Sequence, residues 1–251
     1  MKPTALLLLS ALLFSSLPSR ATWSIIITDD HTKMIGIAGA SCTPNVHGIG
    51  LIMPGKGAIV VQAMSNGIAR FTGFQMIMNN VPAVSILQKL REPAFDPEDQ
   101  QYAVLCLYDN NMPQTYTGTK NHGYAGVLTA PGISVQGNTL TGPEVIKAAF
   151  DAAVKAKKDS LPLEEILMKA LEAGANAGGD KRCGERRASS AFLTVSKPDY
   201  LEKHWLEIIV TQKDDHTAAV QQLKKELDNW KLVQKDKALR VPPTKHLKPV
   251  L

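Results

Sequence analysis

The period of the hydrophobic positions changes several times along the chain, and each change predicts a different element. Short apolar and β-branched runs bounded by turn residues predict strands at 22–28, 34–41, 49–53, 57–63, 102–107, 114–118, 133–136, 188–195 and 205–211. Helical spacing predicts helices at 71–92, 143–157, 162–175 and 217–233. We expect Pro82 to divide the first helical stretch in two, because proline cannot donate a hydrogen bond inside a helix.

These elements follow the order strands, helices, strands, helices, strands, helix. That order favours antiparallel sheets covered by helices over a repeated βαβ unit, so the sequence predicts an α+β sandwich. The Gly-rich segment 119–132 is expected to contain a loop, and the Lys- and Pro-rich residues 235–251 to form a loose C-terminal tail. One domain over 22–234 accounts for the elements between the tail and the N-terminal segment.

Residues 1–21 have the pattern of a secretory signal peptide. Lys2 supplies the positive start, Ala5 to Phe14 form a ten-residue apolar stretch, and the small residues Ser19 and Ala21 suit the −3 and −1 positions of a cleavage site. Ten residues are about half of what a bilayer span requires, which makes an uncleaved membrane anchor the weaker alternative. The sequence therefore predicts a protein exported to the periplasm or beyond, without a stable membrane anchor.

Cleavage after Ala21 would make Thr22 the first residue of the mature chain. The new α-amine, with an ordinary pKa of about 7.7–8.0, could take the proton of the Thr22 hydroxyl near neutral pH. This arrangement is one known form of an activated nucleophile. Signal peptidase also favours small residues at this place for its own reasons, so a merely structural Thr22 stays open.

Composition and charge narrow the function classes. The chain has 251 residues, of which 44% are hydrophobic and 20% charged, and this ordinary globular composition excludes disorder and coiled coil as its main content. Lys2 and Arg20 lie in the leader, so the formal net charge of the remainder falls from +5 to +3. Much of that excess lies in the tail, and we therefore expect no nucleic-acid partner.

The chain contains no motif typical of a metal or cofactor site. HExxH, CxxC, P-loop and GxSxG patterns are missing, and the six histidines are scattered, so the sequence predicts no metal and no cofactor. Polar clusters remain at 62–66 (QAMSN), 136–138 (QGN) and 178–190 (GGDKRCGERRASS). Taken alone, each of them is more typical of turns and helix caps than of a functional site.

Several segments in this order resemble one family. They are 22–26 (TWSII), 36–42 (GIAGASC), 57–63 (GAIVVQA), 134–138 (SVQGN), 142–144 (GPE) and 173–180 (AGANAGGD). Together they resemble the family of unknown function DUF1028, which is placed with the N-terminal-nucleophile (Ntn) hydrolases, over residues 22–232. The resemblance implies a four-layer αββα sandwich of two antiparallel sheets. Many members of the family begin Met-Thr, so methionine removal would expose the threonine that signal peptidase exposes here.

The resemblance also implies a mechanism, in which the Thr22 hydroxyl attacks the carbonyl of a linear amide in a small-molecule or peptide substrate. Asn66 and Asn138 are then the expected oxyanion donors, with Gln62 and Gln136 positioning the substrate. Two further residues, Asp180 and Arg182, are expected to orient the amine or bind a substrate carboxylate. The alternative is a non-catalytic exported binding or surface-assembly protein on the same fold.

One departure from the wider superfamily concerns the charge beside the nucleophile. Proteasome-type members place a lysine near the second strand, whereas this chain has Ser41 and Cys42 there, so Arg182 or Arg186 is expected to supply the positive charge.

The cysteines lead to one more expectation. In the implied sandwich, Cys42 and Cys183 lie at the nucleophile end of the sheets, which predicts a disulfide between them worth about 3–5 kcal/mol. Cys106, within an apolar strand, is expected to be a buried free thiol. Neither the substrate nor the oligomeric state can be predicted from the sequence.

Overall fold

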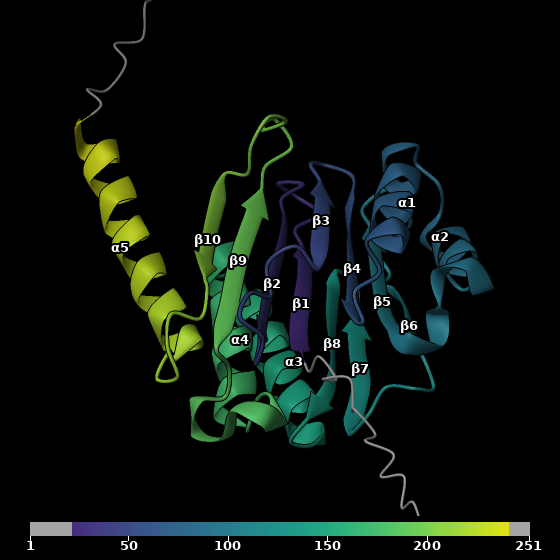
Figure 1. Ribbon diagram of the computed structural model, residues 1–251. Helices are drawn as coiled ribbons and strands as arrows, with labels where there is room; N and C mark the ends of the chain where they lie inside the picture. The colour runs from purple at the N-terminus through teal and green to yellow at the C-terminus, as the bar shows by residue number, and fades with distance from the viewer. Residues whose placement is uncertain (1–21, 241–251) are drawn as a thin grey trace, which may run out of the picture.

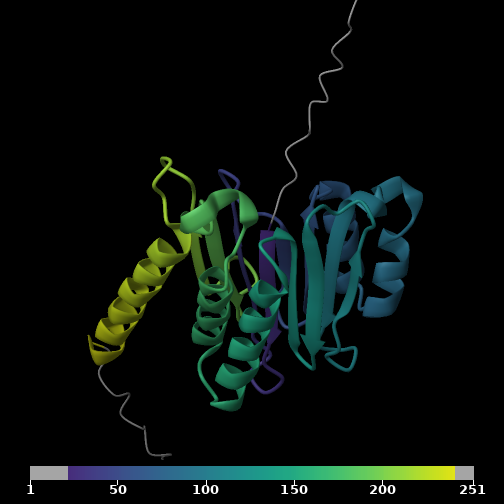
Figure 2. The same ribbon diagram turned by 90° about the horizontal axis from the view of Figure 1, so that it is seen from below.

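The computed structural model describes residues 22–240, which form four layers. Two antiparallel sheets pack face to face, and helices cover the outer face of each sheet (Figures 1 and 2). This is the α+β sandwich that the sequence predicts. Within the described residues, no helix is long and apolar enough to span a bilayer.

The larger sheet has six strands in the order β10-β9-β2-β1-β8-β7, with β1 near its centre. Every residue of β1 is buried, because helices pack on one face of this strand and the second sheet on the other. The bounds of the six strands are β1 (Thr22–Thr28), β2 (Ile35–Ser41), β7 (Tyr124–Ala130), β8 (Ile133–Leu140), β9 (Ser190–Ser196) and β10 (Leu206–Val210).

The smaller sheet has four strands in the order β3-β4-β5-β6. Its central strands, β4 and β5, are buried along their whole length and face the larger sheet. The bounds are β3 (Gly50–Met53), β4 (Gly57–Ala63), β5 (Gln100–Cys106) and β6 (Gln114–Thr117).

The helices form the two outer layers. The larger sheet is covered by α3 (Pro143–Lys158), α4 (Leu163–Asn176) and, at the β9 and β10 edge, α5 (Ala219–Arg240). The smaller sheet is covered by α1 (Gly67–Met78) and α2 (Ala83–Leu90), which Pro82 separates as expected. A 3₁₀ segment, η3 (Lys181–Arg186), lies between α4 and β9, and two short ones, η1 (Pro93–Phe95) and η2 (Pro97–Asp99), precede β5.

Three hydrophobic clusters fill the three interfaces between these layers. Along β1 the side chains alternate, so that Trp23, Ile25 and Ile27 pack under the helices while Ile26 packs between the sheets. The layer between the sheets is apolar around Ile26 but polar toward Thr22. This polar half is the part of the core that positions the candidate site.

Two sequence predictions about elements are wrong. Half of the expected loop at 119–132 forms the edge strand β7, and β8 continues past residue 136 to Leu140. β7 is partly exposed, contains Gly126 and carries a bulge at Tyr124, so it lacks the continuous apolar run by which a buried strand is recognised.

The C-terminal boundary also differs from the prediction. Helix α5 continues to Arg240, so residues 235–240 are helical and do not belong to a loose tail. Lys, Ala, Leu and Arg are strong helix formers, which explains the extension. The predicted signal peptide, 1–21, and the rest of the predicted tail, 241–251, lie outside the described residues.

Candidate functional site

Thr22 begins the central strand of the larger sheet and lies between two neighbouring strands. It pairs with Ser41 at the end of β2 and with Asn138 on β8. Its side chain lies on the face of β1 that points toward the smaller sheet, and the residue is only 3% exposed. Thr22 lines a cavity of about 620 Å³, so it meets the first requirement for a nucleophile, which is access to a ligand.

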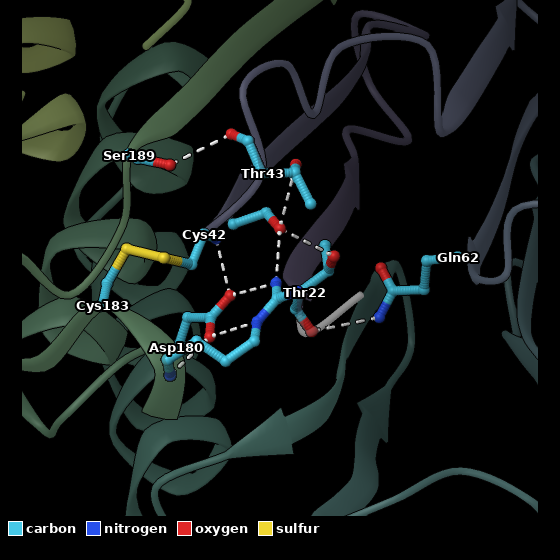
Figure 3. Close-up of polar contacts among 9 residues, drawn as sticks. Thr22, Cys42, Thr43, Gln62, Asp180, Cys183 and Ser189 are labelled. Atoms are coloured by element: carbon cyan, nitrogen blue, oxygen red, sulfur yellow. Dashed lines mark hydrogen bonds and ion pairs between the residues drawn. A yellow bond between two sulfur atoms is a disulfide. The ribbon is translucent and has the colours of Figure 1, made fainter. Parts of the chain in front are cut away.

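The Thr22 hydroxyl belongs to a cluster of polar groups centred on Ser41. Figure 3 shows how Thr22, Thr43 and Asp180 lie around this cluster. Thr22 Oγ1 donates a hydrogen bond to Ser41 Oγ at 3.3 Å, and Thr43 Oγ1 donates to the same oxygen at 3.2 Å. The Arg182 guanidinium also donates to Ser41 Oγ, at 3.4 Å. A positive charge therefore lies one hydrogen bond beyond the hydroxyl that contacts Thr22.

Asp180 holds this arginine in place. Its fully buried carboxylate accepts hydrogen bonds from the Arg182 backbone N–H at 3.0 Å and from the guanidinium at 2.8 and 3.1 Å. It also accepts the backbone N–H of Cys42 at 2.6 Å, which ties it to the end of β2. Gly179 precedes Asp180 with a φ of +59°, and a Cβ there would lie 2.7 Å from the carbonyl oxygen of Arg187, so only glycine suits this turn.

A disulfide joins the same two segments covalently. Cys42, directly after β2, is bonded to Cys183 in η3, with a Cα–Cα distance of 5.5 Å across 141 residues of sequence. The predicted pairing is confirmed, and Cys106 is a buried free thiol as expected. The bond and the Asp180 contacts together fix the arginine-bearing segment η3 against the strand end beside Thr22 (Figure 3).

On the other side of Thr22 lies a network of buried side-chain amides. Gln62 Nε2 on β4 donates to the Thr22 carbonyl oxygen at 3.4 Å and to Gln101 Oε1 at 2.7 Å. Asn138 Nδ2 donates to the same Gln101 oxygen at 3.2 Å. Gln101 Nε2 in turn donates to the carbonyl oxygen of Gly137 at 3.0 Å. Of the predicted residues, Gln62 and Asn138 thus lie beside Thr22.

Gln136 is part of the network but lies deeper between the sheets. Its Nε2 donates to Ser24 Oγ at 2.7 Å, and Ser24 Oγ donates to Gln62 Oε1 at 2.7 Å. Gln136 is fully buried and is not among the residues that line the cavity. Gln136 therefore helps to orient Gln62 through Ser24 and does not contact a ligand in the cavity.

Asn66 has a different place from the one expected. It is the N-cap of α1, where its side-chain oxygen accepts the backbone N–H groups of Ile68 and Ala69, both at 3.0 Å. Its side-chain nitrogen donates to the carbonyl oxygen of Phe95 at 3.1 Å. The structure therefore does not bring Asn66 to the cavity wall, because the start of the helix takes up its hydrogen-bonding groups.

Sequence reasoning missed three residues of this site as contributors. Ser41 and Gln101 collect hydrogen bonds from distant parts of the chain, and Arg70, on the first turns of α1, lines the cavity. The signal for Gln101 was a polar residue at an inward position of a buried strand. Within 22–236, no group of three or more His, Cys, Asp or Glu side chains has an arrangement that could hold a metal ion.

The family comparison agrees with this geometry. The model of the family of unknown function DUF1028 matches residues 22–223, which begin at Thr22 and include the whole of the site described above. The chain belongs to the DUF1028 family.

A solved structure of a DUF1028 protein shows the same fold. The crystal structure of protein SPO2555 from Silicibacter pomeroyi, matched to the same family model, superimposes with a TM-score of 0.70 at 22% sequence identity. The match covers 83% of this chain and 85% of that chain. No curated protein matches this sequence. At this identity the likeness establishes the sandwich alone.

Proposed function

We propose that this DUF1028 protein is exported, loses residues 1–21, and acts as an Ntn hydrolase that cleaves a linear amide with Thr22 as its nucleophile. The observation that carries the proposal is the place of Thr22, whose hydroxyl lies in the wall of a 620 Å³ cavity at the first position of a central strand. Removal of the leader at this residue would put a primary amine beside that hydroxyl.

The reaction follows from these groups. The α-amine takes the proton of Thr22 Oγ1, and the oxygen attacks the amide carbonyl carbon. When the C–N bond of the tetrahedral intermediate breaks, the ammonium returns the proton to the leaving amine. A water molecule then hydrolyses the resulting ester, delivering one proton back to Thr22 Oγ1 and releasing the acid.

The neighbours of Thr22 have matching roles in this proposal. Ser41 orients the hydroxyl, and the Arg182 charge behind Ser41 favours the form of the site in which the Thr22 oxygen becomes negative. Asp180 keeps that arginine in place. Asp180 and Arg182 thus act on the nucleophile side of the site, where the superfamily's lysine would otherwise stand.

The oxyanion of the intermediate needs donors close to Thr22. We assign this role to the side-chain amide of Gln62, which lines the cavity and would give up its long 3.4 Å hydrogen bond to the Thr22 carbonyl oxygen in favour of the oxyanion. Its second N–H stays bound to Gln101 Oε1, which pre-orients the amide, and Asn138 holds Gln101 from outside the cavity lining. Asn66 is not part of this assignment.

The disulfide supports export. A disulfide such as the one between Cys42 and Cys183 is typical of proteins that fold in an oxidising compartment. It also stabilises η3, on which the proposed arrangement beside Thr22 depends.

The test compares mature chains that differ only at the first residue. Thr22→Ser keeps both the hydroxyl and the amine, Thr22→Val keeps the shape but lacks the hydroxyl, and a chain with one glycine before Thr22 keeps the hydroxyl but loses its adjacent amine. Release of primary amine is measured on a panel of N-acyl amino acids and short peptides. We expect activity in the wild type and in Thr22→Ser, and a loss of about a thousandfold or more in the other two.

A matched control is Thr32→Ala, which removes an exposed threonine hydroxyl from the β1–β2 turn, outside the cavity lining. This variant should turn over at the wild-type rate. Equal hydrolysis by wild type and Thr22→Val would contradict Thr22 as the nucleophile. No hydrolysis by the wild type would contradict the enzyme and favour a non-catalytic binding protein on the same fold.

A further inference from the structure

The charges in the cavity wall are of one sign. Arg70, Arg182 and His47 are the ionisable side chains among its lining residues, apart from the disulfide-bonded Cys42. Within the described part of the chain, no aspartate or glutamate contributes to the wall. An opening with this composition attracts anions and repels cations.

Two of these three groups have a carboxylate partner behind the wall. Arg182 forms its ion pair with Asp180 at 2.8 Å, and His47 Nε2 lies 3.4 Å from Glu207. Neither carboxylate lines the cavity, so both lie outside its wall. Arg182 and His47 therefore each already have an acidic partner within the protein.

Arg70 differs from both. Among residues 22–236 no carboxylate lies within 4 Å of its guanidinium, and its hydrogen bond there is to Ser65 Oγ at 3.0 Å. The side chain is half-buried, and this burial lowers the pKa of the Arg70 guanidinium because it disfavours the charged form. Since the ordinary pKa of arginine is far above neutrality, Arg70 stays charged and carries the cost of that desolvation.

The backbone just before Arg70 has an unfavourable conformation, and this turn holds the Arg70 guanidinium in place. Ala63 and Ser65, which both line the cavity between β4 and α1, have φ values of +71° and +55°. Ser65 Oγ donates to the carbonyl oxygen of Val61 and accepts the Arg70 hydrogen bond, so the turn fixes the guanidinium at the wall. Non-glycine residues are unfavourable in the left-handed region, so the surrounding contacts must hold them there.

We infer that the substrate carries a carboxylate and that Arg70 binds it. That this ligand is a substrate rests on the proposed function. The inferred substrate class is an amide with one free carboxylate, such as an N-acyl amino acid or a peptide with a free C-terminus. One uncompensated guanidinium matches a single negative charge, and its planar donors fit both oxygens of a carboxylate. Arg182 keeps its place beside Ser41.

The test measures binding without turnover. The mature Thr22→Val chain is titrated, by calorimetry at low salt, with N-acetylalanine and with trialanine, and separately with the carboxamide form of each ligand. We expect both carboxylates to bind about tenfold or more tightly than their amides, because a charge-assisted pair to a half-buried arginine is lost in the amide. Whichever of the two carboxylates binds more tightly shows whether the site prefers an N-acyl amino acid or the C-terminus of a peptide.

Three arginine variants in the same background test the role of Arg70. Arg70→Gln should remove the preference for the carboxylate, and Arg70→Lys should keep part of it. Arg91→Gln, the control, changes the net charge by the same amount as Arg70→Gln at the C-cap of α2, outside the cavity lining, and should keep the preference intact. A preference that survives Arg70→Gln, that is lost equally in Arg91→Gln, or that is missing from the start overturns the inference.

The outcome is separable from that of the proposed function. A carboxylate preference that depends on Arg70, together with no hydrolysis by the chain that begins with Thr22, would support this site and contradict the enzyme. Hydrolysis that depends on Thr22 without any carboxylate preference would support the enzyme and contradict this site.

Discussion

Thr22 Oγ1 donates a hydrogen bond to Ser41 Oγ at 3.3 Å, across the paired ends of β1 and β2. Ser41 also accepts hydrogen bonds from Thr43 and from the Arg182 guanidinium, so it links the candidate nucleophile to the nearest positive charge. This link joins the strand ends to an arginine 141 residues further along the chain than Ser41. The first prediction concerns this link.

Removing the Ser41 hydroxyl should lower kcat more than it changes KM. In Ser41→Ala, Thr22 loses the group that orients its hydroxyl, and we expect a decrease of about tenfold to a hundredfold. Ser41→Thr, which keeps a hydroxyl, should recover part of the rate. The matched control is Ser190→Ala, because Ser190 pairs with Ser41 on β9 and its buried hydroxyl has no hydrogen-bond partner among the described residues. A Ser41→Ala enzyme as active as Ser190→Ala would contradict the proposed link.

The second prediction concerns the stability that Asp180 provides. Asp180→Asn leaves the Arg182 charge without its carboxylate and weakens the contact with the Cys42 N–H. Breaking a fully buried ion pair lowers the free energy of unfolding by about 3–5 kcal/mol. Since the Arg182 side chain is 26% exposed, we expect a somewhat smaller loss, about 2–4 kcal/mol. Urea denaturation gives the free energy of unfolding.

Glu185→Gln is the matched control for that measurement. Its ion pair with Arg187 is at the surface, with the Glu185 side chain 95% exposed, and the variant should differ little from wild type. Equal losses of unfolding free energy in the two variants would show that Asp180 contributes no more to stability than a surface ion pair does.

The third prediction separates the disulfide from the remaining thiol. Replacing both Cys42 and Cys183 with serine should lower the free energy of unfolding by about 3–5 kcal/mol, and activity should fall because η3 is no longer fixed beside Ser41. Cys106 serves as an internal control, since burial raises the pKa of its thiol to about 11 and the side chain is fully buried. Iodoacetamide at pH 8 should modify Cys106 only after unfolding. Stoichiometric modification of the native protein would contradict the packing of β5.

The fourth prediction is a pH dependence of stability. Burial lowers the pKa of His204 below its ordinary value of 6.5, while Ser196 Oγ lies 2.6 Å from its Nδ1. The unfolded chain therefore binds a proton at a higher pH than the folded chain does, and stability should fall as the pH decreases below about 6.5. His204→Gln should remove this part of the slope between pH 7 and pH 5. An unchanged slope in the variant would assign the effect to other groups.

Sequence patterns predicted the fold well where burial is one-sided or complete. The central strands β1, β2, β4 and β5 are buried along their whole length and rich in apolar residues, and the Pro82 break separates α1 from α2 as expected. The edge strand β7 was missed because its residues are exposed in part and it contains Gly126, a residue type common in loops. The end of α5 was missed because lysines suit both a solvated helix and a tail.

The candidate site was predictable only in part, since its contacts join strands far apart in the sequence. Asn138 could be placed near Thr22 through the resemblance, but the pairing of β1 with β8 depends on the whole sheet order. Asn66 shows the opposite case, in which a local rule holds. An Asn directly before the first residue of a helix is a good N-cap, and this local role explains its place in the structure.

The central claim is that the leader ends immediately before Thr22, and the most direct test is the N-terminal sequence and intact mass of the exported chain. We predict a mature protein that begins with Thr22 and contains one disulfide. A chain that keeps any residue before Thr22, or that starts after it, would contradict the account, because no amine would then stand beside the hydroxyl in the cavity wall.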